Sequence, residues 1–226
     1  MGRFINLDGF ITTGTGFLGH NMFAYCNNNS VMFIDPTGDL FKKIQDFCDI
    51  FIEIAEIIIT SVSLFLMGFN DYSFENAKDC RDALLTYEID TPEEKAHFFA
   101  QCYVEGNTSI LEAGYLPDSI AEDYRKSQRY YPYYGAGYIQ LTWDYNYKSF
   151  SEAMNDPLIY SEGPKYVAEH YPWSSAGWFW DNNNINSVIM NGGGSVSDVT
   201  LIVNGGYSQL NEREQMHQLY YSYWCN

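Results

Sequence analysis

The chain has 226 residues, enough for one well-buried domain and a smaller appendage, because domains of roughly 100 to 150 residues are the commonest. It carries 12 Lys and Arg against 29 Asp and Glu, and the resulting formal charge of -17 would repel the phosphate backbone of a nucleic acid. We therefore expect no nucleic-acid partner.

The cysteines and histidines show no spacing typical of a disulfide framework or a metal site. No CxxC pair occurs, and the histidines are too dispersed to assemble a metal cluster or a Ser/His/Asp triad. The residues are Cys26, Cys48, Cys80, Cys102 and Cys225, and His20, His97, His170 and His217. We therefore expect no metal site and interpret each histidine as a structural or surface residue.

Residues 1–38 are rich in Gly, Asn, Asp and aromatic residues and have no helical periodicity, so we expect a leader of short β-strands and turns. They also lack the features of a secretory signal peptide, so any export is expected to use another route or a larger parent chain. The segments "GRFINLDGF" and "GHNMFAYCNNNSVMFIDPTGD" resemble the closing part of an Rhs/YD-repeat core, although Ser30 stands where Pro is usual. This resemblance implies a polymorphic-toxin cassette, in which a toxin domain follows the leader.

An apolar stretch from Asp39 to Phe69 is a candidate helix because it has no internal Pro and no Gly before Gly68. Its longest charge-free part, Ile57 to Phe69, is shorter than the roughly 20 residues needed to cross a bilayer. We expect a buried or amphipathic helix, and a membrane-inserting segment over residues 48–69 is the alternative. Residues 39–90 are expected to form this helix and a helical linker.

A second amphipathic helix is predicted to begin at Pro92, with Thr91 as its N-cap. Apolar residues at helical spacing predict its buried face: Ala96, Phe99, Ala100 and Tyr103. Glu105 falls near the end of this helix, where a carboxyl group can be partly desolvated and serve as an acid. Glu112 follows seven residues later, and two carboxyl groups are the minimal equipment for glycoside hydrolysis. From spacing alone, both would be interpreted as ordinary surface glutamates.

Four separated segments resemble family 19 glycoside hydrolases, which include chitinases and endolysins. They are "FFAQCYVEGN" at 98–107, "YYGAGYIQLTWDYNY" at 133–147, "AGWFWDNNNIN" at 176–186 and "LIVNGGYSQLNER" at 201–213. The resemblance implies a mainly α, lysozyme-like domain with a deep catalytic cleft over residues 91–226. Two departures from the family pattern, Val104 for His and Ala136 for Arg, bear on activity or substrate preference.

Carried over position by position, the resemblance makes Glu105 the general acid. Glu112 is the expected base for the attacking water, with Glu122 as a competitor, and Thr142 helps to hold that water. The substrate-binding positions that it implies are Gln140, Tyr145, Asn146, Asn204 and Arg213, the last of which pairs electrostatically in the network of the acid. Among these and nearby residues, Tyr145, Trp178 and Trp180 are expected in the core, while Gln140 and Asn204 are expected to face or brace the cleft.

These roles imply an inverting hydrolase of β-1,4-linked N-acetylhexosamine polymers that needs neither a metal nor an organic cofactor. Chitin and peptidoglycan share this backbone, and the Rhs-like leader favours peptidoglycan as the target of an antibacterial toxin delivered out of the producing bacterium. A cognate immunity protein is a possible partner. The alternatives are a chitinase, an inactive domain that binds glycan or an immunity protein, and a membrane-active toxin.

Overall fold

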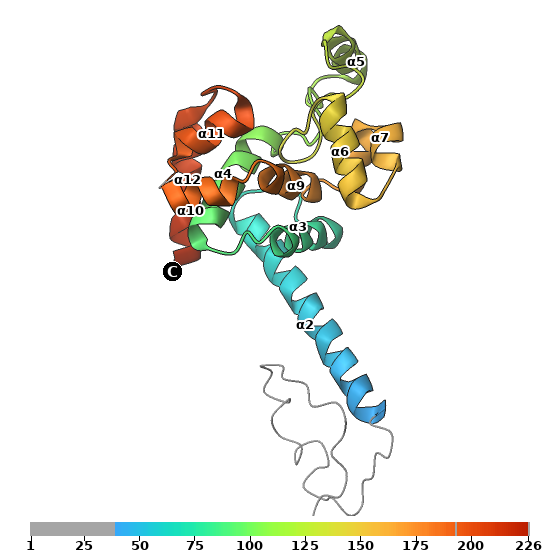
Figure 1. Cartoon of the computed structure of the whole chain (residues 1–226), viewed down its shortest axis with the longest axis vertical. Helices are drawn as coiled ribbons and strands as arrows, with labels where there is room; N and C mark the ends of the chain where they lie inside the picture. The colour runs from blue at the N-terminus through green and yellow to red at the C-terminus, as the bar shows by residue number, and fades with distance from the viewer. Residues whose placement is uncertain (1–38, 193, 226) are drawn as a thin grey trace, which may run out of the picture. The chain divides into compact units, whose positions relative to one another are not determined.

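The computed structural model describes residues 39–192 and 194–225, and the expected leader lies outside them. The chain divides into two compact units, residues 1–55 and 56–226. Helix α2 (Asp39–Leu66) runs from the first unit into the second (Figure 1). In the first unit the structure describes only the beginning of this helix.

The second unit is built from helices and irregular connections. Its further helices are α3 (Phe74–Thr86), α4 (Pro92–Gly106), α5 (Asp118–Ser127), α6 (Asp144–Met154), α7 (Leu158–Glu162), α8 (Pro164–His170), α9 (Ser174–Asn182), α10 (Ile185–Gly192), α11 (Val196–Asn204) and α12 (Leu210–Cys225). Within the described ranges, β-type pairing is limited to two isolated bridges, Leu111 with Ala136 and Ala136 with Leu141. The predicted mainly α fold is confirmed.

The core of the second unit surrounds α4, which packs most extensively against α12, while α3 packs against α9 (Figure 1). Phe69 lies within a cluster of rings, with ring-centroid distances of 5.9 Å to Phe99 and 5.1 Å to Trp173. Residues 56–90 thus share one core with the chain that follows. The domain boundary expected at residue 90 falls inside this compact unit, because the first buried residues of that core precede it.

Helix α4 begins where the sequence predicted. The Thr91 hydroxyl accepts a hydrogen bond from the backbone N–H of Glu94, and the Glu94 carboxylate accepts one from the backbone N–H of Thr91, which together form a capping box. Of the predicted inner face, Ala96 and Phe99 are buried and Tyr103 is partly buried. This rigid start fixes the direction of the helix that carries Glu105.

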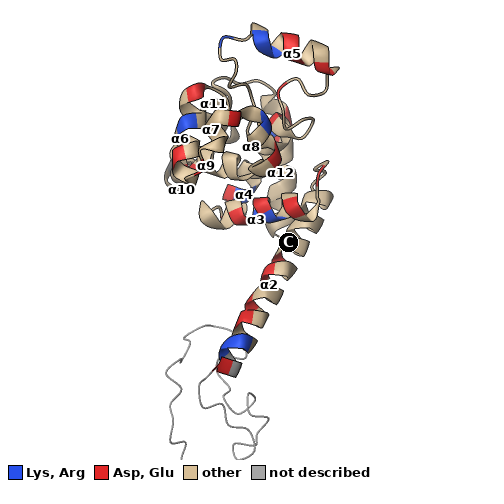
Figure 2. Ribbon diagram, turned by 90° about the vertical axis from the view of Figure 1, so that its right-hand side faces the viewer, with Lys and Arg blue, Asp and Glu red and all other residues tan. Residues whose placement is uncertain are grey.

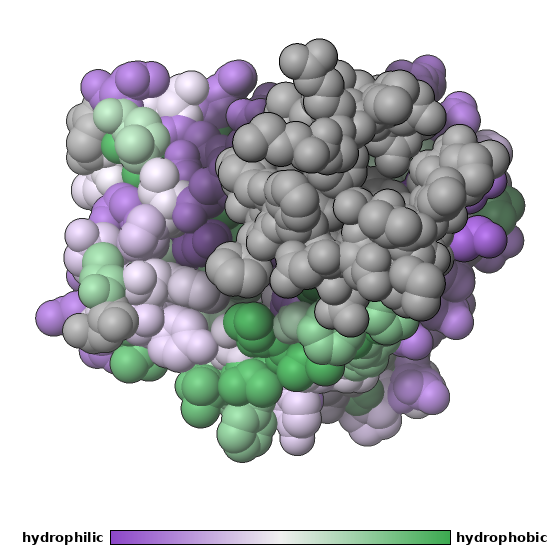
Figure 3. All heavy atoms as spheres, turned by 90° about the horizontal axis from the view of Figure 1, so that it is seen from below, coloured by the Kyte–Doolittle hydropathy of each residue, from purple (hydrophilic) through white to green (hydrophobic). Residues whose placement is uncertain are grey.

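The part of α2 in the second unit is amphipathic, as the sequence predicted. Ile57 and Leu64 are buried in the core, whereas Ile58, Ile59 and Val62 are more than half exposed. Figure 3 shows apolar side chains gathered on part of the face seen from below. Among the described residues, none of the helices combines the length and the apolar character needed to span a bilayer.

Candidate active site

Glu105 lies in the last turn of α4, with its side chain only 17% exposed. Its Oε1 atom accepts a hydrogen bond from Nη2 of Arg213 at 2.6 Å and another from Nδ2 of Asn204 at 3.3 Å. Both bonds end on the same oxygen, and the described residues provide no hydrogen bond to Oε2. One carboxylate oxygen is therefore fixed, while the other remains available to a bound molecule.

Arg213 connects Glu105 to the interior of the unit. It comes from α12, its side chain is 1% exposed, and its Nη1 atom donates to Oε1 of Gln101, one turn before Glu105 on α4. Gln101 in turn donates from Nε2 to the hydroxyl of Thr200 on α11 at 3.0 Å. Three helices thus hold one buried polar network, in which the planar guanidinium orients the carboxylate of Glu105.

Gly106, directly after Glu105, allows the end of α4 to approach the segment 135–142 closely. A Cβ atom at Gly106 would lie 2.5 Å from Cα of Tyr138, so it would clash unless the backbone moved. The backbone of Tyr138 is itself fixed, because its N–H donates to the carbonyl of Pro172 at 2.9 Å. The missing side chain at Gly106 therefore sets the spacing between the acid and this segment.

We expect Gly106→Ala to lower the free energy of unfolding by about 1–3 kcal/mol, the usual cost of overpacking a tight contact. Gly206→Ala is a matched control, since a Cβ atom there would meet only Oδ1 of Asn204, at 3.7 Å. Urea unfolding of both variants measures the difference. Equal stability of the two variants would show that the contact with Tyr138 is not tight.

Glu112 lies in the turn after the segment 107–110, and its carboxylate is held on both oxygens. Oε1 accepts from the hydroxyl of Tyr130 at 2.5 Å, and Oε2 accepts from the backbone N–H of Gly135 at 2.9 Å. The Glu112 backbone bonds the Gly135 carbonyl through its N–H and accepts from Nε of Arg125 at 2.7 Å. Glu112 is thus attached to the same segment 135–142 that contacts the end of α4.

The segment 135–142 therefore borders both glutamates. Gln140, with a positive φ of 52°, donates from Nε2 to the carbonyls of Ser109 and Gly137. The Thr142 hydroxyl donates to the carbonyl of Gln140 at 2.7 Å, and the Thr142 carbonyl accepts from Nδ2 of Asn146 at 2.8 Å. Gln140, Thr142 and Asn146 brace the segment, and the Thr142 hydroxyl oxygen keeps lone pairs with which it could accept a hydrogen bond from water.

Tyr145 differs from the expectation that it packs in the core. Its side chain is 59% exposed, and its ring stacks on that of Trp143, with centroids 6.1 Å apart and planes 16° apart. Trp143 also contacts the ring of Tyr130 edge to face at 5.4 Å. Tyr145 is the second residue of α6, and this position at the start of the helix leaves its ring outside the core. The other two aromatic expectations are confirmed, because Trp178 and Trp180 are 6% and 0% exposed.

Tyr130, which the sequence reasoning did not single out, holds Glu112 through its hydroxyl. Burial and, next, the hydrogen bond to Glu112 raise the pKa of this phenol above its usual range, so it stays protonated and remains a donor at neutral pH.

We expect Tyr130→Phe to lower kcat about tenfold on a glycan substrate while stability changes by about 1 kcal/mol. Tyr131→Phe is the control, because the Tyr131 hydroxyl makes a long hydrogen bond of 3.4 Å, and makes it to Glu122 instead of Glu112. Equal kcat in both variants would show that the Tyr130 hydroxyl does not contribute to the site.

Glu122, the competitor for the second carboxylate, lies on α5 away from this bonding pattern. Its Oε1 atom pairs with Nζ of Lys126 at 3.4 Å, and its side chain is 36% exposed. Figure 2 shows both acidic and basic residues on the ribbon of α5, with the basic residues Arg125 and Lys126 in its last turn. The contacts of Glu122 are those of a solvated helix face, whereas the Glu112 carboxylate is held on both oxygens, by Tyr130 and by the backbone N–H of Gly135.

The structure brings together most of the residues that the sequence nominated. Glu105, Asn204 and Arg213 form one bonded group, and Gln140, Thr142 and Asn146 form another with the backbone of the segment 135–142. The sequence motifs did not indicate the other residues that hold this site, which are Gln101, Thr200, Tyr130, Trp143 and Arg125. Gln101 stands within the quoted "FFAQ" segment, so a buried polar residue on an apolar helix face was the signal that could have found it.

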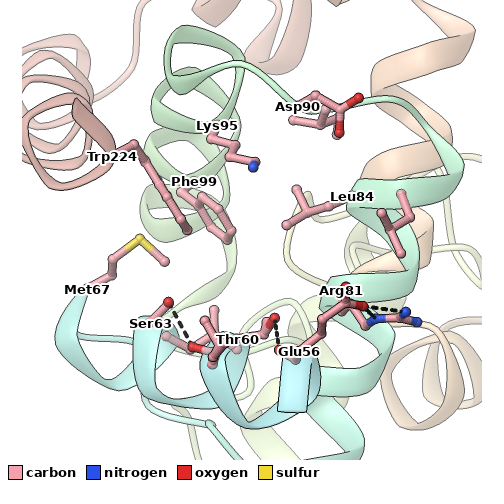
Figure 4. A pocket seen from close by; sticks show the side chains of 14 residues that line it. Glu56, Thr60, Ser63, Met67, Arg81, Leu84, Asp90, Lys95, Phe99 and Trp224 are labelled. Atoms are coloured by element: carbon pink, nitrogen blue, oxygen red, sulfur yellow. Dashed lines mark hydrogen bonds and ion pairs between the residues drawn. The ribbon is translucent and has the colours of Figure 1, made fainter. Parts of the chain in front are cut away.

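A separate apolar pocket lies between α2, α3, α4 and α12 (Figure 4). It has a volume of about 220 Å³, and its lining includes Met67, Leu84, Phe99 and Trp224. Its one lining glutamate, Glu56, is engaged by Arg81 at 2.6 Å, as Figure 4 also shows. Asp90 also lines the pocket, but none of the site residues nominated by the sequence does, so this pocket is distinct from the candidate active site.

Comparison with solved structures places the second unit in a known class of fold. A bacterial family 19 chitinase superposes with a TM-score of 0.51 at 22% identity, covering 64% of this chain and 83% of its own. Chitinase C from Streptomyces griseus superposes with a TM-score of 0.50 at 22% identity, covering 64% of this chain and 82% of its own. The described residues have the lysozyme-like, mainly helical fold of these chitinases.

Sequence comparison gives the same class. An endochitinase of Arabidopsis thaliana is 38% identical over 76 residues, which are 33% of this chain. The matched part spans 25% of the length of that relative. None of the protein-family models matches the chain. The chain is thus similar in sequence to part of an endochitinase and similar in fold to family 19 chitinases.

Proposed function

We propose that residues 56–225 form an inverting glycoside hydrolase that cleaves β-1,4 bonds in polymers of N-acetylhexosamines. The observation that supports this most is the state of Glu105. Its Oε1 atom is fixed by Arg213 and Asn204, while its Oε2 atom has no bond from the described residues. A chain with the fold of family 19 chitinases and a carboxyl group held in this way has the central requirement of a general acid.

In the proposed reaction, Glu105 protonates the glycosidic oxygen from Oε2 as the bond to the anomeric carbon breaks. Glu112 accepts a proton from water, which attacks that carbon from the opposite face, and Thr142 helps to orient the water. Displacement from the opposite face gives a product with inverted configuration, and it requires carboxyl groups about 6.5–9.5 Å apart. Arg213 keeps its charge throughout, so it stabilises the carboxylate that Glu105 becomes after giving up its proton.

Tyr145 supplies a proposed sugar-binding surface. Its exposed ring is parallel to that of Trp143, and Arg129 lies over the Trp143 ring at 5.0 Å, which stiffens the pair. Flat aromatic faces bind the apolar faces of sugar rings. Tyr145, with Asn146 beside it on α6, is therefore proposed to bind a sugar unit adjacent to the cleaved bond.

For the natural substrate we propose the glycan strands of bacterial peptidoglycan, with the domain acting as an antibacterial toxin outside the producing cell. The support is the resemblance of residues 1–38 to the end of an Rhs-type core. A cognate immunity protein in the producer is the partner that such a role requires. Chitin is the alternative substrate, favoured by the names of the relatives.

The test compares purified protein on peptidoglycan and on soluble chitin oligomers, with release of new reducing ends as the measurement. Faster turnover of peptidoglycan supports the toxin proposal, and faster turnover of chitin oligomers contradicts it in favour of a chitinase. Binding of either glycan without any turnover would overturn the enzyme proposal and leave a glycan-binding domain.

A further inference from the structure

We propose that Glu93, His97 and His217 form a binding site for a divalent transition-metal ion, with Zn²⁺ as the best-fitting ion. Glu93 and His97 lie four residues apart on α4, and His217 comes from α12. One carboxylate oxygen and one ring nitrogen from each histidine all lie within 4.8 Å of one another. The sequence did not indicate this site, because 120 residues separate the two histidines and only the packing of α12 on α4 brings them together.

The distances between the donor atoms fit a metal ion. Oε1 of Glu93 lies 3.3 Å from Nε2 of His97 and 3.2 Å from Nε2 of His217. Zinc bonds to nitrogen and oxygen are about 2.0–2.2 Å long, so two ligands at a tetrahedral angle are about 3.3–3.6 Å apart. The two observed distances are therefore close to those that a shared ion would impose, and small side-chain rotations would suffice to admit it.

One nitrogen that faces Glu93 lacks a hydrogen bond. Nε2 of His217 is buried and has no hydrogen bond from the described residues, although Oε1 of Glu93 lies 3.2 Å away. The His97 side chain is 1% exposed, and the two imidazole rings are only 4.0 Å apart between centroids. Buried polar atoms without a partner are costly, and a metal ion would satisfy a nitrogen that the protein leaves unpaired.

The ligand set is chemically suited to such an ion, because neutral imidazole is the form that binds a metal and the Glu93 carboxylate supplies negative charge. Glu93 is 40% exposed, which leaves room for water as a fourth ligand.

A metal ion here would join the two helices that hold the candidate active site. Arg213 lies one helical turn before His217 on α12, and Glu105 lies at the end of the helix that carries Glu93 and His97. The Arg213–Glu105 pair depends on the register of α12 against α4. We infer that the ion fixes this register, and this role is independent of the substrate that the site cleaves.

The test is a Zn²⁺ titration of chelator-treated full-length protein by calorimetry, with the thermal midpoint measured in parallel. We expect one ion per chain and a thermal midpoint that rises with Zn²⁺. Loss of an outer-shell partner costs about 10- to 100-fold in metal affinity, so Glu93→Gln and His217→Gln are each expected to lose about 100-fold or more. Both side chains are partly exposed, so these variants are expected to fold.

Matched controls are Glu75→Gln, which removes another first-turn carboxylate on α3, and His170→Ala, which removes an exposed histidine. Co²⁺ substitution distinguishes this site from the cysteines, because a thiolate ligand adds an intense near-ultraviolet charge-transfer band. Binding that is lost only in the Glu93 and His217 variants, without that band, supports the proposal. Absence of Zn²⁺ binding, unchanged affinity in both variants, or a thiolate band would overturn it.

Discussion

Glu105→Gln is expected to lower kcat on soluble chitin oligomers and on peptidoglycan by about 10²- to 10⁴-fold, the usual contribution of a general acid. Glutamine fills the same space and can still accept a hydrogen bond from Arg213 at its Oε1 atom, but its amide has no acidic proton that it could transfer to the glycosidic oxygen. The fold and the substrate affinity are therefore expected to survive the change. Initial rates of reducing-end release, with thermal unfolding of the same sample, measure both effects.

Glu122→Gln is the matched control for this variant. It removes the competing carboxylate on α5, which pairs with Lys126 rather than with the segment 135–142. Its kcat is expected to stay within about twofold of that of the unchanged protein. The kcat of Glu112→Gln is instead expected to decrease, as that of Glu105→Gln does. Full activity of Glu105→Gln would contradict the assignment of Glu105 as the acid. Loss of activity in Glu122→Gln, with activity retained in Glu112→Gln, would show that Glu122 and not Glu112 is the second carboxylate.

Arg213→Met is expected to lower the free energy of unfolding by about 3–5 kcal/mol, because it removes one partner of a buried ion pair and leaves the other without compensation. Arg213 is 1% exposed and Glu105 is 17% exposed, so water replaces little of what is lost. Gln101 also loses the donor to its Oε1 atom. Urea unfolding measures the change, and the same variant is expected to lose activity because Glu105 is no longer held.

Arg81→Met provides a contrast on the surface. Its pair with Glu56 has the same length, 2.6 Å, but its two side chains are 20% and 47% exposed. A pair with this exposure contributes about 1 kcal/mol or less. The loss of stability in Arg213→Lys is expected to lie between those of Arg213→Met and Arg81→Met. Lysine keeps the charge but cannot bond Gln101 and Glu105 with one planar group. Similar losses for Arg213→Met and Arg81→Met would show that the Glu105 network is not under special constraint.

The parts of the fold that local sequence controls were predictable. The start of α4 followed from Thr91 and Pro92, since an N-cap and a first-turn proline act within a few residues of the chain. The inner face of the same helix followed from its apolar spacing. The position of Glu105 near the helix end then needed only counting along the helix.

The contacts between distant segments were not predictable from spacing. Gln101 and Arg213 meet across 112 residues, and the capping of α4 contains no information about α12. The family resemblance nominated Arg213 as a partner in the network of the acid, and the structure places it on Glu105. Tyr130 and Trp143 had no such nomination, because a tyrosine or tryptophan in an aromatic-rich chain is more often a core residue.

One expectation failed for a physical reason that the sequence does not encode. Tyr145 was expected in the core because aromatic residues usually pack there, but it lies at the exposed start of α6. The histidines are dispersed in the sequence, and His97 and His217 become neighbours in the structure because α12 packs along α4. In each case, tertiary packing decided the outcome.

The most direct test of the central claim is the anomeric form of the first product released from a soluble chitin oligomer or a purified peptidoglycan glycan strand, followed by proton NMR before mutarotation. Water attacking from the face opposite the protonated oxygen converts a β-linked sugar to the α-anomer. We expect initial accumulation of the α-anomer, with no such signal from Glu105→Gln. Initial accumulation of the β-anomer would contradict the proposed roles of Glu105 and Glu112.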